Sequence, residues 1–155
     1  MLLLIIIAAN GAPIVLHKWL GQRLFYPIDM NWKFVDGKRL FGDAKTWLGV
    51  VGIILVSVVL SWLLGLGWIT GAIAAIGVIS GDLLSSFIKR RLGMRVSSMA
   101  LGLDQIPESL FPFWMLMNTY NFTFLDITLA VLCFMALELV LSHLLYRWHV
   151  REKPY

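Results

Sequence analysis

The sequence predicts an all-helical integral membrane protein with five membrane-spanning helices, and three observations predict this class. Of the 155 residues, 59% are hydrophobic and 14% are charged, against about 25% charged residues in soluble domains. The chain therefore has too few polar residues to cover the surface of a soluble fold. Five apolar windows each approach the ~20 residues that a helix needs to cross hydrocarbon. The basic residues are confined to alternate connections between these windows.

The apolar windows cover residues 1–16, 47–64, 67–88, about 98–117 and 122–146. Two of them carry residues that interrupt an apolar helix, so we expect these two to be short or broken. The interrupting residues are Asn10, Gly11 and Pro13 in the first window, and Asp104, Pro107, Glu108 and Pro112 in the fourth. A cleavable signal peptide fits the first window poorly, because Met1 is followed directly by leucines without a basic region.

Two connections are short enough to be tight turns, at residues 65–67 and 118–121. After the second turn, Thr123 and Asp126 have the spacing of a capping box, which predicts the start of the last helix and a structural role for Asp126. Small residues stand four positions apart in two series along the third window, so other helices can approach it closely, and we expect this helix to be central. These small residues are Gly67, Gly71, Ala75, Gly77 and Gly81.

The chain has 13 Lys and Arg residues and 9 acidic residues, which gives a formal net charge of +4. All 13 basic residues lie on one predicted side of the membrane. They are Lys18, Arg23, Lys33, Lys38, Arg39 and Lys45 between the first two windows; Lys89, Arg90, Arg91 and Arg95 between the third and fourth; and Arg147, Arg151 and Lys153 after the fifth. The positive-inside rule therefore predicts an N-terminus outside and a C-terminus inside the cell. We therefore expect residues 1–155 to form one domain in the cell (inner) membrane, with cytoplasmic loops forming the active site.

The first basic loop combines two glycines with a Lys-Thr pair at a helix start. Residues 36–47 read D-G-K-R-L-F-G-D-A-K-T-W. Backbone N–H groups, the helix dipole, the Lys45 ammonium and the Thr46 hydroxyl can together hold phosphate oxygens. The spacing is not that of a P-loop, and a plain loop with Lys45 at the lipid headgroups explains the same residues about as well.

The cytoplasmic end of the third window carries four polar residues on one helix face. Asp82, Ser85, Ser86 and Lys89 stand at i, i+3, i+4 and i+7. A carboxylate within a membrane span is costly unless it meets a partner, water or a metal, which favours a functional role. The alternative is a structural contact between Asp82 and Lys89.

A second acidic pair, Asp104 and Glu108, stands at i and i+4 at the entry to the fourth window. Together with Asp82, these carboxylates could meet beneath the basic loops, where they would suit Mg²⁺ bound partly by substrate phosphates. Zinc is not expected, because Cys133 and the three histidines lack ligand spacing. Glu138 lies deep in the fifth window, where a helix-packing hydrogen bond explains it better than catalysis.

Four segments in this sequence resemble the CDP-archaeol synthase family, which is related to the CDP-diacylglycerol synthases. They are N-G-A-P (10–13), D-G-K-R-L-F-G-D-A-K-T-W-L-G (36–49), G-D-L-L-S-S-F-I-K-R-R-L-G (81–93) and L-D-Q-I-P-E-S (103–109). The resemblance implies that CTP and a lipid phosphate react, with Mg²⁺, to give a CDP-lipid and pyrophosphate. It also implies that Asp82 and Asp104 bind metal. The sequence departs from the larger synthase pattern at Arg95-Val96 and Asp104-Gln105, which favours one metal over two.

Residue roles follow from the motifs and the resemblance together. We expect Asp82, Lys89 and Asp104 to be catalytic. The expected substrate-binding residues are Asn10, Lys38, Arg39, Lys45, Thr46, Ser85, Ser86 and Arg90. A phosphate monoester is largely dianionic at neutral pH, so it can attack phosphorus without a strong protein base, and the sequence offers no obvious one.

Two alternatives to this function remain open on the sequence. The same reaction could act on diacyl phosphatidate, because any apolar groove would accept either lipid chain. A small transporter or accessory subunit would also contain intramembrane carboxylates, but here the polar residues gather at one face instead of forming a track across the membrane. No nucleic acid is expected as a partner, and the sequence leaves a homo-oligomer open.

Overall fold

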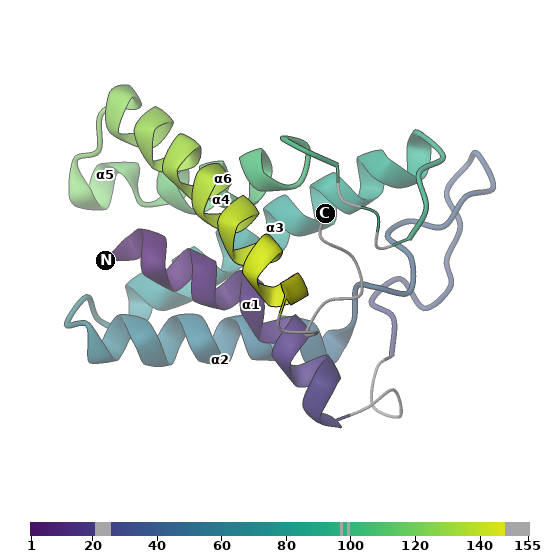
Figure 1. The fold of residues 1–155 in the computed structure, drawn as a ribbon, viewed down its shortest axis with the longest axis horizontal. Coiled ribbons are helices and arrows are strands. Elements are labelled where there is room, and N and C mark those ends of the chain that lie inside the picture. The colour runs from purple at the N-terminus through teal and green to yellow at the C-terminus, as the bar shows by residue number, and fades with distance from the viewer. Residues whose placement is uncertain (21–25, 97, 99, 148–155) are drawn as a thin grey trace.

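The computed structural model describes residues 1–20, 26–96, 98 and 100–147, and within these ranges every regular element is helical. Figure 1 shows the elements, and Arg23, His149, Arg151 and Lys153 lie outside the described residues. The helices are α1 (Leu2–Leu20), α2 (Trp47–Leu63), α3 (Trp68–Arg91), α4 (Gln105–Met115), α5 (Met117–Tyr120) and α6 (Phe124–Arg147).

The first window forms one continuous helix, so it is not broken, but its apolar part, Leu2–His17, is short, as the sequence predicts. α1 runs from Leu2–Leu20 with Pro13 inside it. A proline removes one backbone hydrogen bond from a helix, and here its ring packs against α2: a Cβ atom placed on Gly49 would lie 3.5 Å from Pro13 Cβ. Packing against a neighbouring helix allows α1 to continue through the proline.

The second and third helices form an antiparallel pair around a two-glycine turn. Gly65 and Gly67 both have positive φ, of 75° and 83°, which side chains rarely adopt. Further along α3, a Cβ on Gly71 would lie 2.5 Å from the Ser57 carbonyl oxygen, so the two backbones touch. The small residues of the third window therefore allow a close approach, as the sequence predicts.

α3 makes an equally close contact with α4 on another face. A Cβ on Gly77 would lie 2.5 Å from Pro112 N, and one on Gly81 would lie 2.3 Å from the Pro107 carbonyl oxygen. Because 77 meets 112 and 81 meets 107, the two helices are antiparallel in a defined register. This register decides which polar residues of α3 and α4 face each other.

The fourth window is short, as its prolines and acids predict. α4 begins only at Gln105 and has 11 residues, about 16 Å of helix at 1.5 Å per residue. The short helix α5 follows it, and the turn ends at Asn121, whose φ is 52°. The predicted capping box is confirmed, because Asp126 accepts a hydrogen bond from Thr123 N (2.8 Å) and Asp126 N donates to Thr123 Oγ1 (3.2 Å).

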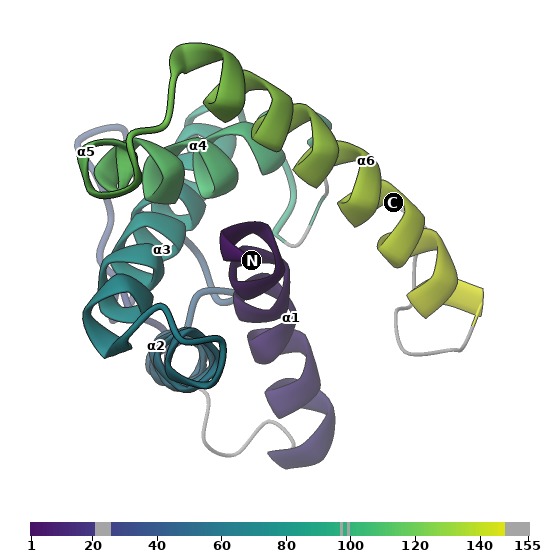
Figure 2. The ribbon, with the colours of Figure 1, turned by 90° about the vertical axis from the view of Figure 1, so that its left-hand side faces the viewer.

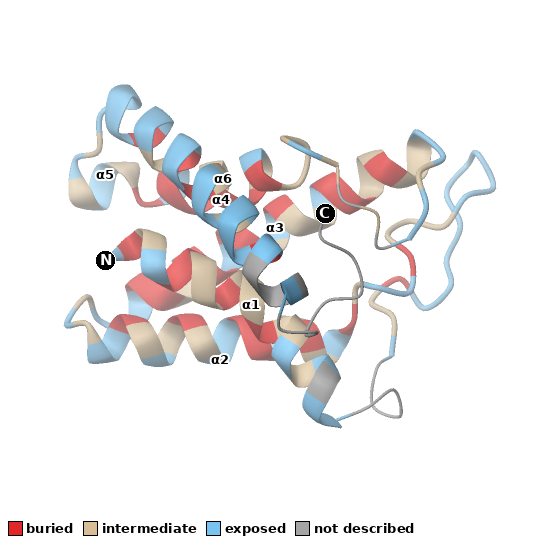
Figure 3. Ribbon diagram, in the orientation of Figure 1, coloured by how far each residue is buried: buried red, intermediate tan, exposed pale blue. Residues whose placement is uncertain are grey.

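The core lies around α1, which contacts α2, α3, α4 and α6 (Figure 2). Ile5, Ile6 and Ala9 of α1 are completely buried. α6 packs on the rest through Phe134 and leaves much of its apolar surface exposed (Figure 3). Among the described residues, α3 and the Phe124–His143 part of α6 are long and apolar enough to cross a membrane, while Leu2–His17 and Trp47–Leu63 are shorter apolar helices.

Candidate active site

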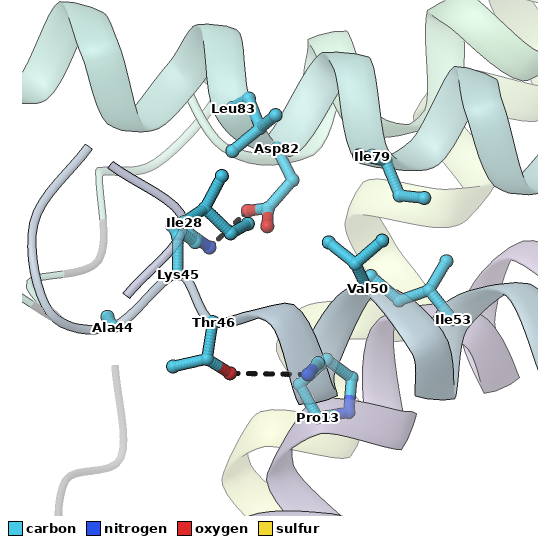
Figure 4. Close-up of a pocket in the computed structure, with 11 residues that line it drawn as sticks. Pro13, Ile28, Ala44, Lys45, Thr46, Val50, Ile53, Ile79, Asp82 and Leu83 are labelled. Atoms are coloured by element: carbon cyan, nitrogen blue, oxygen red, sulfur yellow. Dashed lines mark hydrogen bonds and ion pairs between the residues drawn. The ribbon is translucent and has the colours of Figure 1, made fainter. Parts of the chain in front are cut away.

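A cavity lies where the N-terminus of α2 meets the middle of α3 and the connection between α1 and α2 (Figure 4). It is small and partly open to solvent, with a volume of about 40 Å³. Its polar residues come from two of the sequence motifs, because Lys45 and Thr46 stand at the start of α2 and Asp82 stands on α3. The other lining residues are Pro13, Ile28, Ala44, Gly49, Val50, Ile53, Ile79 and Leu83.

Thr46 begins α2 as its N-cap. Its backbone is extended, with φ −125° and ψ 152°, and its hydroxyl oxygen accepts a hydrogen bond from Gly49 N at 3.2 Å. An N-cap satisfies one of the free N–H groups at the start of a helix. The residue before it, Lys45, is thereby held at the positive end of the helix dipole, in the lining of the cavity.

The Lys45 ammonium donates a hydrogen bond to the Asp82 carboxylate, and Figure 4 shows the two side chains pointing toward each other. Burial by itself lowers the pKa of Lys45. The negative charges of Asp82 and Glu108 outweigh this effect, so the pKa of Lys45 lies above its usual value. The cavity therefore contains an ammonium that stays charged and a carboxylate that neutralises it.

Glu108 of α4 brings a second carboxylate to this point. Its side chain interacts electrostatically with Asp82, Lys45 and Glu138. The contact follows from the helix register, because a Cβ on Gly81 would lie 2.6 Å from Glu108 N. The acidic pair beside Lys45 is therefore Asp82 with Glu108.

Lys89 and Asp104 form a second ion pair at the next level of the α3–α4 contact. Their charged atoms are 2.7 Å apart, and Lys89 also donates to the Ser98 carbonyl oxygen at 3.0 Å. Lys89 lies seven residues beyond Asp82, about 10 Å along the helix. The structural contact between Asp82 and Lys89 that the sequence allowed is not formed, because each residue pairs with a different part of the chain.

The two predicted serines lie in the packed face of α3 and do not line the cavity. Ser85 is completely buried, Ser86 is 3% exposed, and the Ser85 hydroxyl donates to the Asp82 carbonyl oxygen at 3.0 Å. Small buried side chains allow helices to pack closely. In this structure the serines support the helix that carries Asp82.

The remaining predicted residues lie on two sides of this site. Three cations gather near the C-terminal end of α3, where each binds another part of the protein: Lys38 donates to the Arg91 carbonyl oxygen (2.8 Å), Arg90 donates to the Arg95 carbonyl oxygen (2.8 Å), and Arg39 pairs with Asp29 and Asp43.

Asn10 lies apart from these cations, in a second cavity between α1 and α6, where its side-chain nitrogen is buried without a hydrogen-bond partner. This cavity also contains Glu138 and Ser142.

Sequence reasoning gave no role to Asp29 or to Arg91, and both organise the loop between α1 and α2. The Arg91 guanidinium lies 5.1 Å from the ring centre of Phe34 and 4.7 Å from that of Phe87, and its Nε is 3.0 Å from Asp36. The i, i+4 spacing of Phe87 and Arg91 on α3 was the available signal for half of this contact. No local pattern indicated that Phe34 would complete it.

The donor atoms at the site fit a magnesium ion. Within the described ranges, no group of three or more His, Cys, Asp or Glu residues is placed to enclose a metal. Mg²⁺ does not need such a group, because it keeps several waters and is usually bound by one or two carboxylates plus substrate phosphates. Asp82 and Glu108 supply two neighbouring carboxylates, and Asp82 lines the cavity.

Comparison with known proteins identifies the family. The sequence model of the CarS-like family, described as CDP-archaeol synthase, matches residues 20–155. The chain belongs to this family. It is 33% identical to the CDP-archaeol synthase of Sulfurisphaera tokodaii over 140 residues, covering 83% of this chain and 81% of that protein. It is 36% identical to the CDP-archaeol synthase of Archaeoglobus fulgidus over 155 residues, covering 83% and 84%.

A solved structure extends the likeness from sequence to fold. It was reported as an intramembrane enzyme for archaeal membrane lipids biosynthesis, and it superposes with a TM-score of 0.74 at 30% identity over 91% of this chain and 90% of that one. This relative and the apolar helices identify the chain as a membrane protein. The predicted CDP-archaeol synthase resemblance and the all-helical class are therefore confirmed.

Proposed function

We propose that this protein is a CTP-dependent cytidylyltransferase of membrane-lipid biosynthesis, which converts a lipid phosphate to a CDP-lipid and pyrophosphate. CDP-archaeol synthase is the activity for which its relatives are named. The observation that carries the proposal for this chain is the cluster of Lys45, Asp82 and Glu108 beside the cavity at the start of α2. The cluster combines a buried cation with carboxylates, which is what joining two phosphates requires.

In the proposed reaction, an oxygen of the lipid phosphate attacks the α-phosphorus of CTP. A bond forms between that oxygen and the phosphorus, the bond from the α-phosphorus to the α–β bridging oxygen breaks, and pyrophosphate leaves with the bonding electrons. The nucleophile is already ionised at neutral pH, so no side chain needs to remove a proton. The barrier is electrostatic, because two anions must meet, and fixed positive charges lower it.

The residues divide this work by charge. We assign Lys45, at the N-terminus of α2, to the phosphate oxygens of CTP, with Lys89 and Arg90 providing positive charge at the next level of the site. Asp82 and Glu108 would hold a magnesium ion, and Asp104 remains a predicted ligand one level away. When bound, the ion would supply further neutralisation of the phosphate oxygens.

The lipid substrate enters this proposal through the membrane. We propose five spans with the N-terminus outside, so that the loop carrying Lys45 faces the cytoplasm, where CTP is present. The cavity between α1 and α6 is mostly apolar, with Ile7, Phe134 and Leu141 around Asn10. It supports a model in which the glycerol end of the lipid lies near Asn10 and its phosphate reaches the α-phosphate of CTP.

The test is turnover of radiolabelled CTP by purified protein with Mg²⁺. An unsaturated diether glycerol phosphate, diacyl phosphatidate and no lipid are compared. We expect CDP-lipid from the ether substrate. No product from either lipid, with folded protein, would contradict the proposal.

Two variants and one matched control tie the reaction to the site. Asp82→Asn and Glu108→Gln keep the size of each side chain and remove its charge, so we expect at least a hundredfold loss of turnover from the first and at least tenfold from the second. Asp43→Asn removes an exposed carboxylate outside the cavity and should leave turnover unchanged. Normal turnover by Asp82→Asn would exclude Asp82 from the reaction.

A further inference from the structure

Asp29 is a buried acid in the loop between α1 and α2, and the mechanism above does not use it. Its side chain is completely inaccessible to solvent. Oδ2 accepts hydrogen bonds from Gly42 N (2.9 Å), Phe41 N (3.1 Å) and Arg39 Nε (3.2 Å). Oδ1 accepts from Asn31 N (3.2 Å) and from a second nitrogen of Arg39. A buried carboxylate is costly unless such donors surround it, so this arrangement has a structural consequence.

The bonds to Asp29 join two parts of the loop that are distant in sequence. Asn31 lies two residues after Asp29, while Phe41 and Gly42 lie 12 and 13 residues after it. Around Asp29 the chain takes an unfavourable path, since Met30 and Asn31 have φ values of 44° and 67°. A left-handed conformation costs a residue such as Met30 about 1–2 kcal/mol, whereas asparagine tolerates it, and the hydrogen bonds of Asp29 offset this cost.

The same bonds lead directly to Lys45. Ile28, next to Asp29, donates its N–H to the Lys45 carbonyl oxygen at 2.8 Å. Lys45 in turn donates its own N–H to the carbonyl oxygen of Gly42 at 3.3 Å, and Gly42 is bound by Asp29. The Lys45 backbone is therefore held on both sides by residues whose positions depend on the Asp29 carboxylate.

We propose that Asp29 is a positioning residue, which holds the loop of residues 28–46 in the shape that places the Lys45 ammonium beside Asp82. The proposal rests on the proposed function insofar as Lys45 serves CTP. Asp29 does not line the cavity and acts only through the loop. Its loss should displace Lys45 and weaken CTP binding, without affecting the lipid, whose proposed cavity lies between α1 and α6.

The test uses Asp29→Asn in the full-length protein, with Asp43→Asn as the matched control. Asp43 pairs with the same Arg39 guanidinium but is exposed, and among the described residues no backbone N–H donates to it. For Asp29→Asn we expect a rise of about tenfold in the KM for CTP, corresponding to about 1.4 kcal/mol, with an unchanged KM for the lipid phosphate. A purely structural defect would reduce the amount of active protein and leave both KM values as they were.

Hydrogen exchange of peptides covering residues 38–46 gives a second readout that needs no substrate. Asp29→Asn should speed their exchange, whereas Asp43→Asn should not. Unchanged exchange and an unchanged KM for CTP in Asp29→Asn would overturn the role of Asp29. If Asp29→Asn does not fold, the same KM and hydrogen-exchange measurements are made on Asp29→Glu, which keeps the charge and lengthens the side chain, and are compared with Asp43→Asn. Absence of turnover in the unsubstituted protein would instead overturn the proposed function.

Discussion

At the scale of single residues, the site is organised by pairing buried charges of opposite sign. Lys45 meets Asp82, Lys89 meets Asp104, and Arg39 meets Asp29. A buried ion pair is weak evidence for stability, because desolvation costs as much as the attraction returns. The pairs are better explained as devices that keep charged groups ionised and fixed where anionic substrates would bind.

Asp29 leads to a prediction about acid sensitivity. Burial alone would raise the pKa of Asp29, but Arg39 and the N–H groups of Gly42, Phe41 and Asn31 lower it from its ordinary value near 3.8 to about 2. Because the folded protein lowers this pKa, the carboxylate contributes its full stabilisation, about 2 kcal/mol, above pH 4 and loses it as the pH falls toward 2.

Hydrogen exchange of the peptides covering residues 38–46, corrected for the intrinsic effect of pH, measures this loss. Exchange should accelerate between pH 4 and pH 2 in the unsubstituted protein. In Asp29→Asn it should be fast throughout, with no such step. A step of equal size in both proteins would assign the acid sensitivity to another group.

At the scale of helices, the contact between α3 and α4 aligns the polar residues of both. Gly77 and Gly81 bring the backbones together, and this register places Asp82 opposite Glu108 and Lys89 opposite Asp104. The site thus depends on residues that carry no functional group. The site therefore needs glycine at position 81, which has no side chain, as much as it needs the Asp82 carboxylate.

Gly81→Ala tests this dependence. The added Cβ would lie 2.3 Å from the Pro107 carbonyl oxygen, so α4 must move. We expect a loss of about 1–3 kcal/mol of stability and a decrease of at least tenfold in turnover. Thermal unfolding in detergent and the CTP assay measure the two effects.

The control for the stability part of this prediction is Gly11→Ala in α1, where the added Cβ would meet no atom within 4 Å. It should stabilise the protein by up to about 1 kcal/mol, since alanine favours helix over glycine. Equal melting temperatures for Gly81→Ala and the unsubstituted protein would contradict the prediction, because α4 would then move away from α3 without any loss of stability.

Sequence periodicity predicted features formed by residues close together in the chain, but it could not predict contacts between residues far apart in the chain. The i, i+4 spacing of the α3 residues, the glycine positions and the capping box at Thr123 are repeated in the structure. The pairing of Lys45 with Asp82 joins residues 37 apart, and it depends on a loop whose shape is determined by Asp29. No short-range pattern carries such information, so nothing in the sequence singled out Asp29, and the contact between Asp82 and Lys89 that the sequence allowed as an alternative is not formed.

At the scale of the whole molecule, the basic loop and the end of α3 lie at the same end, with the α4–α6 turn at the other (Figure 1). Labelling of single cysteines in intact cells, in a Cys133→Ser background, tests the proposed orientation. Val35→Cys, which is 95% exposed in the unsubstituted chain, should react only after the cytoplasm is made accessible. Asn118→Cys should react from outside. Labelling of both from the same side would contradict the five-span topology.

The contact between Lys45 and Asp82 has a further consequence for how the site is filled. The Asp82 carboxylate is already paired with the Lys45 ammonium. A phosphate of CTP must therefore displace Asp82 from Lys45, so the two anions compete for one cation. Asp82→Asn removes the competitor. This variant should bind CTP in the presence of EDTA several-fold more tightly than the unsubstituted protein, by isothermal titration, while failing to turn it over. The residue most needed for the reaction would then be the one that holds its substrate back.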